Sequence, residues 1–278
     1  MPNDLISIII PTIGRSMQLD ALLHSITYST YKNYEVIIID QNQTGMLDHI
    51  ILKYKDFFSI RHVPVNFVGA AKARNYGYKF SDGQYLFFPD DDSELYAETL
   101  ALFIEYSQKT RADVLFGKCE DREFGDSAGS FSDKSGYLSL EDHEGMFIEA
   151  TMFIKREIFA EFFFDESFGV GAFYGAEEAY DLVLRMLHEH VVIFYTPEIK
   201  IYHPHKVINH VDGSEIRRAF SYRCGFAHLC AKHKLYKKYY KRLLQVILYI
   251  PYTIVFTPRK TRYYLSELMG LITGMIVR

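Results

Sequence analysis

The chain has 278 residues, of which 49% are hydrophobic and 24% charged, with a formal net charge of -4. This composition is typical of a folded globular protein and excludes intrinsic disorder. The three cysteines are an odd number and include no close pair at metal-binding spacing, so neither a disulfide framework nor a zinc site is indicated, and we interpret them as reduced thiols. Because the first residues carry neither a basic leader nor a long apolar run, we expect the chain to stay in the cytoplasm.

Charge is distributed unevenly. Residues 1–205 contain 17 Lys and Arg against 32 Asp and Glu, whereas residues 206–278 contain 14 against 3. We therefore predict two parts with different surfaces, residues 1–205 and residues 206–278.

Short β-branched runs alternate with segments of helical spacing in the first part of the chain. Runs that are almost continuously apolar are typical of strands buried on both faces of a parallel sheet. The pattern predicts an α/β fold with a Rossmann-like, mostly parallel sheet flanked by helices. Strands are expected at 5–10, 34–40, 59–65, 84–88 and 113–117, and helices at 16–29, 45–55, 69–81 and 98–110, with Ser16 as the N-cap of the first helix.

The remainder of the chain is less regular. Residues 120–145 are polar and rich in Gly, Ser and Asp, which indicates a mobile loop or an irregular hairpin. An amphipathic helix is predicted at 176–190, followed by two strands within 191–205 that are broken at Pro197. The C-terminal part is predicted to be helical.

Three consecutive carboxylates, Asp90, Asp91 and Asp92, follow the strand at 84–88. Like charges in contact are unfavourable unless a cation or a set of donors offsets them. Ligands of parallel α/β sheets bind at the carboxyl ends of the strands, where Asp40 also falls. The cluster is therefore a candidate cation site, and a solvated acidic turn that caps the next helix is the alternative.

Five motifs carry a resemblance to a known family. In chain order they are SIIIPTIGR, EVIIID, GAAKARNYGYKFSDGQYLFFPDDD, GAEEAYDLVLR and TPEIKIYHP. Their order and spacing resemble the family 2 glycosyltransferases of the GT-A fold, especially the bacterial enzymes that build surface polysaccharides. The resemblance covers roughly residues 5–205 and implies a GT-A catalytic domain at 1–205, with a nucleotide-sugar half at about 1–118 and an acceptor half at about 119–205.

This resemblance implies an inverting, metal-dependent transfer of a hexose or N-acetylhexosamine. The implied donor is a nucleotide sugar, most often a UDP-sugar, and the implied acceptor is a lipid-linked or oligosaccharide glycan in capsule, exopolysaccharide or O-antigen synthesis. A sugar-phosphate nucleotidyltransferase is an alternative, but PTIGRSMQ is a poor match to its Gly-rich phosphate loop. A nucleotide-binding paralogue that has lost activity and scaffolds a membrane assembly is another.

In such enzymes the aspartate cluster is a DXD-type site for a divalent metal. Carboxylate oxygens favour Mn²⁺ or Mg²⁺ over zinc. The resemblance makes Asp92 the first candidate ligand, with Asp90 and His203 as further candidates, and it implies that Asp90 and Asp91 orient the ribose and a metal-bound water. Neutral imidazole can ligate Mn²⁺, although a structural role for His203 is the alternative.

The nucleotide itself is expected near the ends of the first two strands. Asp40 matches the family's acidic residue that accepts a hydrogen bond from the pyrimidine base, although DQNQTG replaces the usual Asp-Asp-Gly-Ser here. The guanidinium of Arg74 can contact ribose or phosphate, and the alternative for this residue is a solvated position on a helix surface. The other candidate nucleotide-sugar residues are Pro11, Thr12, Arg15, Arg74 and Asn75.

An inverting transferase also needs a carboxylate that takes the proton of the attacking hydroxyl. The family's base lies in a pair of acids at the start of a helix, with another acid two residues later. When Asp181 is aligned with that later acid, Ala179 occupies the position that is often the base. We therefore favour Glu178 as the base, then Glu177, then Asp181.

The C-terminal part alternates cations with tyrosines around two apolar runs, at 243–256 and 268–277, that are too short to cross a bilayer. Lys and Arg are attracted to anionic head groups, and Tyr favours the membrane interface. We expect peripheral attachment to the inner face of the cell membrane. Packing onto the catalytic domain or in a homo-oligomer is the alternative, and no motif indicates nucleic-acid binding.

Overall fold

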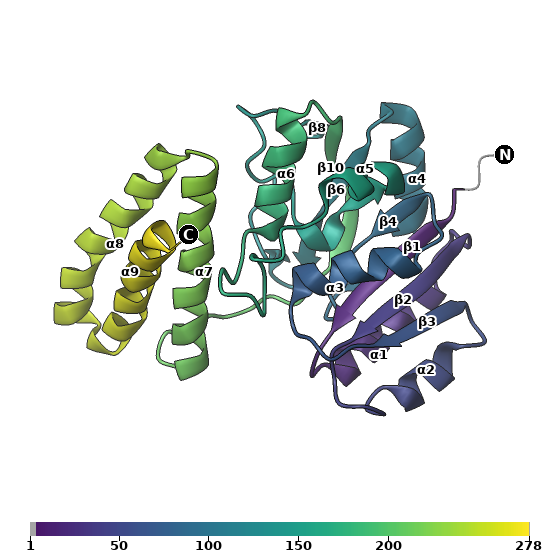
Figure 1. Ribbon diagram of the computed structural model, residues 1–278, viewed down its shortest axis with the longest axis horizontal. Helices are drawn as coiled ribbons and strands as arrows, with labels where there is room; N and C mark the ends of the chain where they lie inside the picture. Colours follow the sequence, from purple (N-terminus) through teal and green to yellow (C-terminus); the bar gives the residue numbers. More distant parts are fainter. Residues whose placement is uncertain (1–3, 278) are drawn as a thin grey trace. The chain divides into compact units, whose positions relative to one another are not determined.

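A computed structural model describes residues 4–277 of the chain (Figure 1). They form two compact units. The sheet unit extends up to Val68 and includes Lys72–Phe164 and Leu182–Lys206, and the helical unit comprises Gly69–Ala71, Asp165–Asp181 and the chain from Val207 onward. The division of the chain at residue 205 into parts with separate functions stays a prediction.

The sheet unit is built on one mixed sheet in the order β3-β2-β1-β4-β9-β6-β10-β5. The neighbours β3-β2, β2-β1, β1-β4 and β6-β10 are parallel, whereas β9 is antiparallel to both of its neighbours. The predicted α/β fold with a mostly parallel sheet is thus confirmed. In chain order, the bounds are β1 Ile6–Thr12, β2 Tyr34–Asp40, β3 Ser59–Pro64, β4 Tyr85–Phe87, β5 Glu94–Leu95, β6 Val114–Asp121, β9 Phe153–Lys155 and β10 Ile193–Tyr202. The short strands β7 Gly125–Asp126 and β8 Gly136–Tyr137 pair with β6 and β10, respectively.

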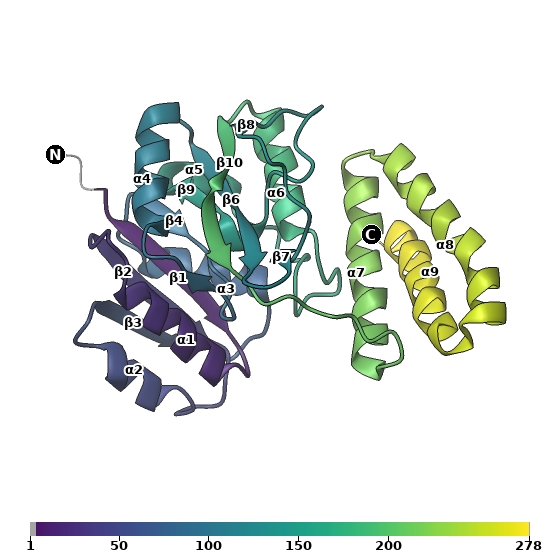
Figure 2. The ribbon, with the colours of Figure 1, turned by 180° about the vertical axis from the view of Figure 1, so that it is seen from behind.

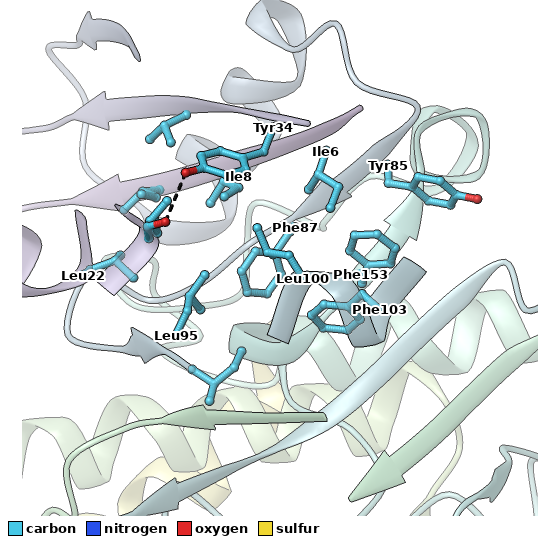
Figure 3. Close-up of a cluster of buried hydrophobic side chains, with 14 of the residues drawn as sticks. Ile6, Ile8, Leu22, Tyr34, Tyr85, Phe87, Leu95, Leu100, Phe103 and Phe153 are labelled. Atoms are coloured by element: carbon cyan, nitrogen blue, oxygen red, sulfur yellow. Dashed lines mark hydrogen bonds between the residues drawn. The ribbon is translucent and has the colours of Figure 1, made fainter. Parts of the chain in front are cut away.

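Helices cover both faces of this sheet. Alternate residues of a strand point to opposite faces, so Ile8 of β1 packs into the cluster shown in Figure 3, together with Leu22 of α1 and Phe103 of α4. On the other face α3 approaches so closely that a Cβ at Gly77 would lie 2.3 Å from Cγ2 of Ile9. The helices of this region are α1 Ser16–Thr27, α2 Asp48–Tyr54, α3 Ala70–Gly77, α4 Thr99–Thr110, α5 Arg156–Phe162 and α6 Glu178–His188, with the 3₁₀ turns η1 Tyr78–Phe80 and η2 Glu149–Thr151.

Two local predictions are wrong. Ser16 is the first residue of α1 rather than its N-cap, which is Arg15, and no side chain caps this helix. Residues 191–205 hold one strand, β10, instead of two. The register of β10 against β6 shifts between Tyr195 and Lys200, so an irregularity accommodates Pro197, which cannot donate to the ladder, without ending the strand.

The C-terminal helices of the helical unit are α7 Gly213–Lys232, α8 Tyr236–Phe256 and α9 Thr261–Ile276, with the 3₁₀ turn η3 Pro258–Lys260 before α9 (Figure 2). Asp212 caps α7 by accepting hydrogen bonds from the backbone N–H groups of Ser214 and Glu215. Between residues 4 and 277, no helix combines the length and apolar character needed to cross a membrane.

Glycine allows α7 and α9 to pack closely. A Cβ at Gly270 would lie 2.4 Å from the carbonyl oxygen of Phe220, and one at Gly274 would lie 2.2 Å from that of Cys224. The two glycines are one helical turn apart, so they form a single contact stripe on α9. A larger side chain at either position would push the two helices apart.

Candidate metal and nucleotide site

Two arginines offset the three consecutive carboxylates after β4. Nη2 of Arg74, on α3, donates to Oδ1 of Asp90 at 2.7 Å. Nη1 of Arg15, which precedes α1, lies 2.9 Å from Oδ1 of Asp91 and 2.6 Å from Oδ2 of Asp92. The guanidinium donors explain how the chain tolerates this charge at the end of a buried strand, because they neutralise part of it in place.

Asp91 is the most enclosed of the three. Only 6% of the residue is exposed, and burial raises the pKa of Asp91 above its usual range. The Thr12 hydroxyl and the Arg15 guanidinium act in the opposite direction, and the charge on Asp92 acts with the burial. Asp91 is therefore held between β1 and Arg15 and is less suited to direct metal binding than its two neighbours.

Asp90, Asp92 and His203 form a group that could hold a metal ion. One ligand atom from each of them lies within 4.8 Å of the others. The residues come from different strand ends, because the aspartates follow β4 and His203 follows β10. Parallel strands present their carboxyl ends at one edge of a sheet, and this brings the three side chains together.

The surroundings of His203 favour a ligand role. Its Nδ1 lies 3.1 Å from the carbonyl oxygen of Pro204 and 3.2 Å from the Ser127 hydroxyl, while its Nε2 faces Oδ1 of Asp92 at 3.6 Å. A carbonyl oxygen can only accept, so the contact with Pro204 favours the tautomer with its proton on Nδ1. Nε2 then carries a lone pair toward Asp92, at a separation too long for a hydrogen bond.

The donor set fits a divalent cation. Two carboxylates suit Mg²⁺ and Mn²⁺ alike, and an added imidazole favours Mn²⁺ because magnesium sites in proteins are built mainly from oxygen ligands. Asp90 is oriented by Arg74, and His203 is oriented by Pro204 and Ser127, so both ligands are supported by neighbouring groups.

Asp40 lies at the end of β2 and is 1% exposed. Its Oδ1 accepts hydrogen bonds from the backbone N–H and the side-chain amide of Asn42, and its Oδ2 lies 2.8 Å from Nε2 of His62 on β3. Sequence reasoning missed His62. The available signal was that His62 is an ionisable residue near the end of β3, the short strand that pairs with β2.

Three further predicted nucleotide residues lie on β1 or next to it. Pro11 and Thr12 end β1 and pair in register with Ile39 and Asp40 of β2. Arg15 follows them, and its contacts are with the aspartates after β4, so the structure places it beside the candidate metal ligands.

Arg74 and Asn75 are built into the protein. Arg74 is 2% exposed, and its guanidinium carbon lies 5.6 Å from the centroid of the Phe164 ring, which excludes a solvated position on a helix surface. Asn75 donates from Nδ2 to the Phe164 carbonyl and accepts from the Phe164 N–H. This amide thus fixes the backbone at Phe164.

The three predicted acids around the start of α6 lie in the helical unit. Asp181 is fully buried, and its Oδ1 lies 2.7 Å from Nζ of Lys232 and 2.8 Å from Nε2 of His233 at the end of α7. Glu178 is 4% exposed, and a Cβ at Gly169 would lie 3.0 Å from its carboxyl carbon. Asp181 therefore has a cationic partner in Lys232 and a second close partner in His233, and Glu178 lies next to the glycine backbone.

Glu177 has two unusual properties. Its φ of 79° places it in the left-handed region, which is uncommon for a residue with a Cβ. Burial raises the pKa of Glu177 to about 7, with a further contribution from the charge on Glu178, against the lowering effect of Lys238 and Arg223. A carboxyl group with a pKa near neutrality is suited to general-base chemistry, and strained backbone is frequent at functional sites.

Comparison with known proteins gives the family. The sequence model of a protein family, glycosyl transferase family 2, matches residues 7–163, which is more than half of the chain. The chain belongs to glycosyl transferase family 2. The predicted resemblance is thereby confirmed, and the matched region includes the aspartates after β4, Asp40, Arg15 and Arg74.

Curated relatives include named bacterial glycosyltransferases. The poly(ribitol-phosphate) β-N-acetylglucosaminyltransferase TarP of Staphylococcus aureus is 32% identical over 117 residues, which are 41% of this chain and 36% of TarP. The Escherichia coli UDP-Glc:α-D-GlcNAc-diphosphoundecaprenol β-1,3-glucosyltransferase WfgD is 27% identical over 121 residues, which are 43% of this chain and 47% of WfgD. The matched segment thus spans less than half of either relative.

Solved structures share the fold at low sequence identity. S. aureus TarS 1–349 superposes with a TM-score of 0.62 at 16% identity, over 97% of this chain and 90% of that one. The mannosyltransferase PcManGT from Pyrobaculum calidifontis, in complex with GDP-Man and Mn²⁺, gives a TM-score of 0.57 at 14% identity, over 98% of this chain and 72% of that one. These likenesses confirm the GT-A fold that the sequence predicts.

Proposed function

We propose that this member of glycosyl transferase family 2 is an inverting glycosyltransferase that depends on a divalent metal. It transfers a hexose or N-acetylhexosamine from a UDP-sugar to a lipid-linked or oligosaccharide acceptor in the synthesis of a surface polysaccharide. The observation that carries the proposal is the convergence of Asp90, Asp92 and His203 within 4.8 Å at the carboxyl edge of the sheet. Family membership supports the reaction class.

Asp90, Asp92 and His203 would hold Mn²⁺ or Mg²⁺. When bound, such a cation neutralises the negative charge that develops on a nucleoside diphosphate as the sugar departs. Arg74 orients the carboxylate of Asp90 through its 2.7 Å contact. Arg15 supplies positive charge beside Asp92 from a side chain that is 47% exposed, so it can also reach a bound phosphate.

Asp40 is the proposed acceptor for the N–H of a pyrimidine base. A carboxylate oxygen can accept more than one hydrogen bond, so the contacts to Asn42 and His62 leave acceptor capacity. These two partners hold the carboxylate in one orientation, which favours selection of one base over another. Two similar proteins support a uridine nucleotide. The name of WfgD specifies UDP-Glc, and TarS 1–349 has been solved in complex with UDP-GlcNAc.

We further propose that the base for the acceptor hydroxyl lies in the pair Glu177 and Glu178. The resemblance to the family's pair of acids favours Glu178, and the pKa of about 7 supports Glu177. Asp181 is a positioning residue in this proposal, because its short contacts to Lys232 and His233 already engage its carboxylate.

A panel of nucleotide sugars incubated with Mn²⁺, with Mg²⁺ or with a chelator tests the proposal. We expect release of UDP from a UDP-hexose or UDP-N-acetylhexosamine only when a metal is present. The variant Asp92→Asn should lose this activity, whereas Asp56→Asn, at an exposed position after α2, should keep it. Release of UDP at the same rate in chelator would refute metal dependence, and metal-dependent UDP binding without any sugar release would assign the chain a scaffold role.

A further inference from the structure

Helix α8 has apolar side chains on two opposite faces. Tyr239, Val246 and Thr253, spaced by seven residues, are buried, and the first two pack in a cluster with Leu271 of α9. A rotation of about 100° per residue places Leu244, Leu248 and Val255 on the opposite side of the helix. There they are exposed by 57%, 67% and 69%.

This outer face continues into exposed cations at both ends. Lys241 and Lys237 lie on it about one and two turns before Leu244. Beyond the C-terminus of α8, η3 and the start of α9 add three exposed cations, Arg259, Lys260 and Arg262. An apolar strip with a basic cluster at each end is typical of a helix that lies in the interface of an anionic membrane.

Carboxylates are missing from the same surface. The only acid between residues 236 and 276 is Glu267, which is 1% exposed. Its carboxylate lies 2.7 Å from Nε of Arg223 and 2.8 Å from Nη2 of Arg242. Within the described residues, the solvent-facing side of α8, η3 and α9 therefore presents positive charge without compensating negative charge.

A second copy of the chain is a poor occupant of this face. In a two-fold dimer the same patch meets itself. Parallel packing would place Lys237 and Lys241 against their own copies, and antiparallel packing would place them against the copies of Arg259, Lys260 and Arg262. Both arrangements bring like charges together around an apolar centre, which is unfavourable.

We propose that the outer face of α8 docks on an anionic lipid bilayer. Leu244, Leu248 and Val255 enter the boundary between head groups and acyl chains, and the flanking cations contact anionic head groups. The helix lies along the surface, because no described helix can cross a membrane. This inference is independent of sugar transfer and would hold for a chain that binds no nucleotide.

Sedimentation with vesicles tests the proposal. The full chain should bind phosphatidylcholine vesicles that contain phosphatidylglycerol, bind less at high salt, and remain in the supernatant with phosphatidylcholine alone. The double variant Leu248→Glu/Val255→Glu should lower the partition coefficient by about tenfold or more, because it puts charge into the apolar contact. Leu52→Glu, on α2 with 62% exposure, is the matched control and should bind like the unaltered chain.

A fluorescence measurement gives an answer that does not depend on the double variant. The chain contains no tryptophan, so Val255→Trp introduces a single probe on the outer face of α8. Its emission should shift to the blue and be quenched by brominated acyl chains when anionic vesicles are added. The control Leu52→Trp should show neither effect.

Three results would overturn the proposal. The first is that the unaltered chain stays in the supernatant with anionic vesicles, and the second is that these vesicles leave the Val255→Trp emission unchanged. A dimer formed without lipid and dissociated by Leu248→Glu/Val255→Glu would assign the face to a second copy instead.

Discussion

Nε2 of His203 lies 3.6 Å from Oδ1 of Asp92, although the two residues follow different strands, β10 and β4. The sheet order places β9 and β6 between those strands, so the contact forms at the carboxyl edge, where the chain turns after each strand toward a common site. Nδ1 of His203 is occupied by Pro204 and Ser127, and this orients the opposite nitrogen toward the carboxylate. Such support is characteristic of a metal ligand.

Replacing His203 should therefore weaken metal binding. We expect His203→Ala to lower the affinity for Mn²⁺ in the presence of UDP by at least about tenfold, as loss of a ligand or of its orienting partners commonly does. The control is His205→Ala, because His205 is exposed two residues further along. Calorimetric titration with Mn²⁺ measures the effect. Equal affinities in the two variants would leave His203 a structural residue.

Replacing each of the two glutamates near the start of α6, Glu177 and Glu178, with glutamine should separate their roles. Glu178→Gln and Glu177→Gln remove the charge with little change in volume, and the variant that lacks the base should bind UDP normally while its rate of transfer falls by about 100-fold or more. Glu189→Gln, at an exposed position just after α6, is the control. Single-turnover transfer with bound donor measures the step. Full activity in both variants would move the role of base to another acid.

The raised pKa of Glu177 also makes stability depend on pH. Because burial raises this pKa from its ordinary value of 4.5 to about 7, the folded state holds a proton that the unfolded state releases between these values. The free energy of unfolding should thus fall as pH rises from about 4.5 to about 7, by at most about 1.4 kcal/mol per unit.

Glu177→Gln should remove this part of the pH dependence and be more stable than the unaltered chain at pH 8. Urea unfolding at pH 5 and pH 8 measures the difference, with Glu189→Gln again as the control. The opposite sign, with the unaltered chain gaining stability relative to Glu177→Gln as pH rises, would show that Glu177 is ionised throughout.

Glu267 of α9 links three helices in the helical unit, because its carboxylate forms ion pairs with Arg223 of α7 and Arg242 of α8. Glu267→Gln would leave two arginines without a counter-charge at a residue that is 1% exposed. Since both arginine side chains retain about 30% exposure, we expect a loss of about 2 kcal/mol, less than for a fully buried pair. Urea unfolding checks this value, and a loss below about 0.5 kcal/mol would mean that the pair behaves like a surface ion pair.

Local pattern was enough for much of the fold. Almost continuous apolar runs indicated β1, β2 and β4, and helical spacing indicated α1 and α4, because both signals repeat within a few residues. The same reasoning missed β9 and α5, whose segment carries no clear period. The antiparallel insertion of β9 between β4 and β6 depends on partners far along the chain, which a local pattern does not contain.

For the candidate site, the sequence by itself determined the acidic cluster at the end of a buried strand and the need for charges to offset it. Only the tertiary structure decided which groups supply them. It paired Arg74 with Asp90 and Arg15 with Asp91 and Asp92, and it placed His62 beside Asp40. The physical reason is that strand and helix formation follow from neighbouring residues, whereas an ion pair depends on where separate elements bring their ends together.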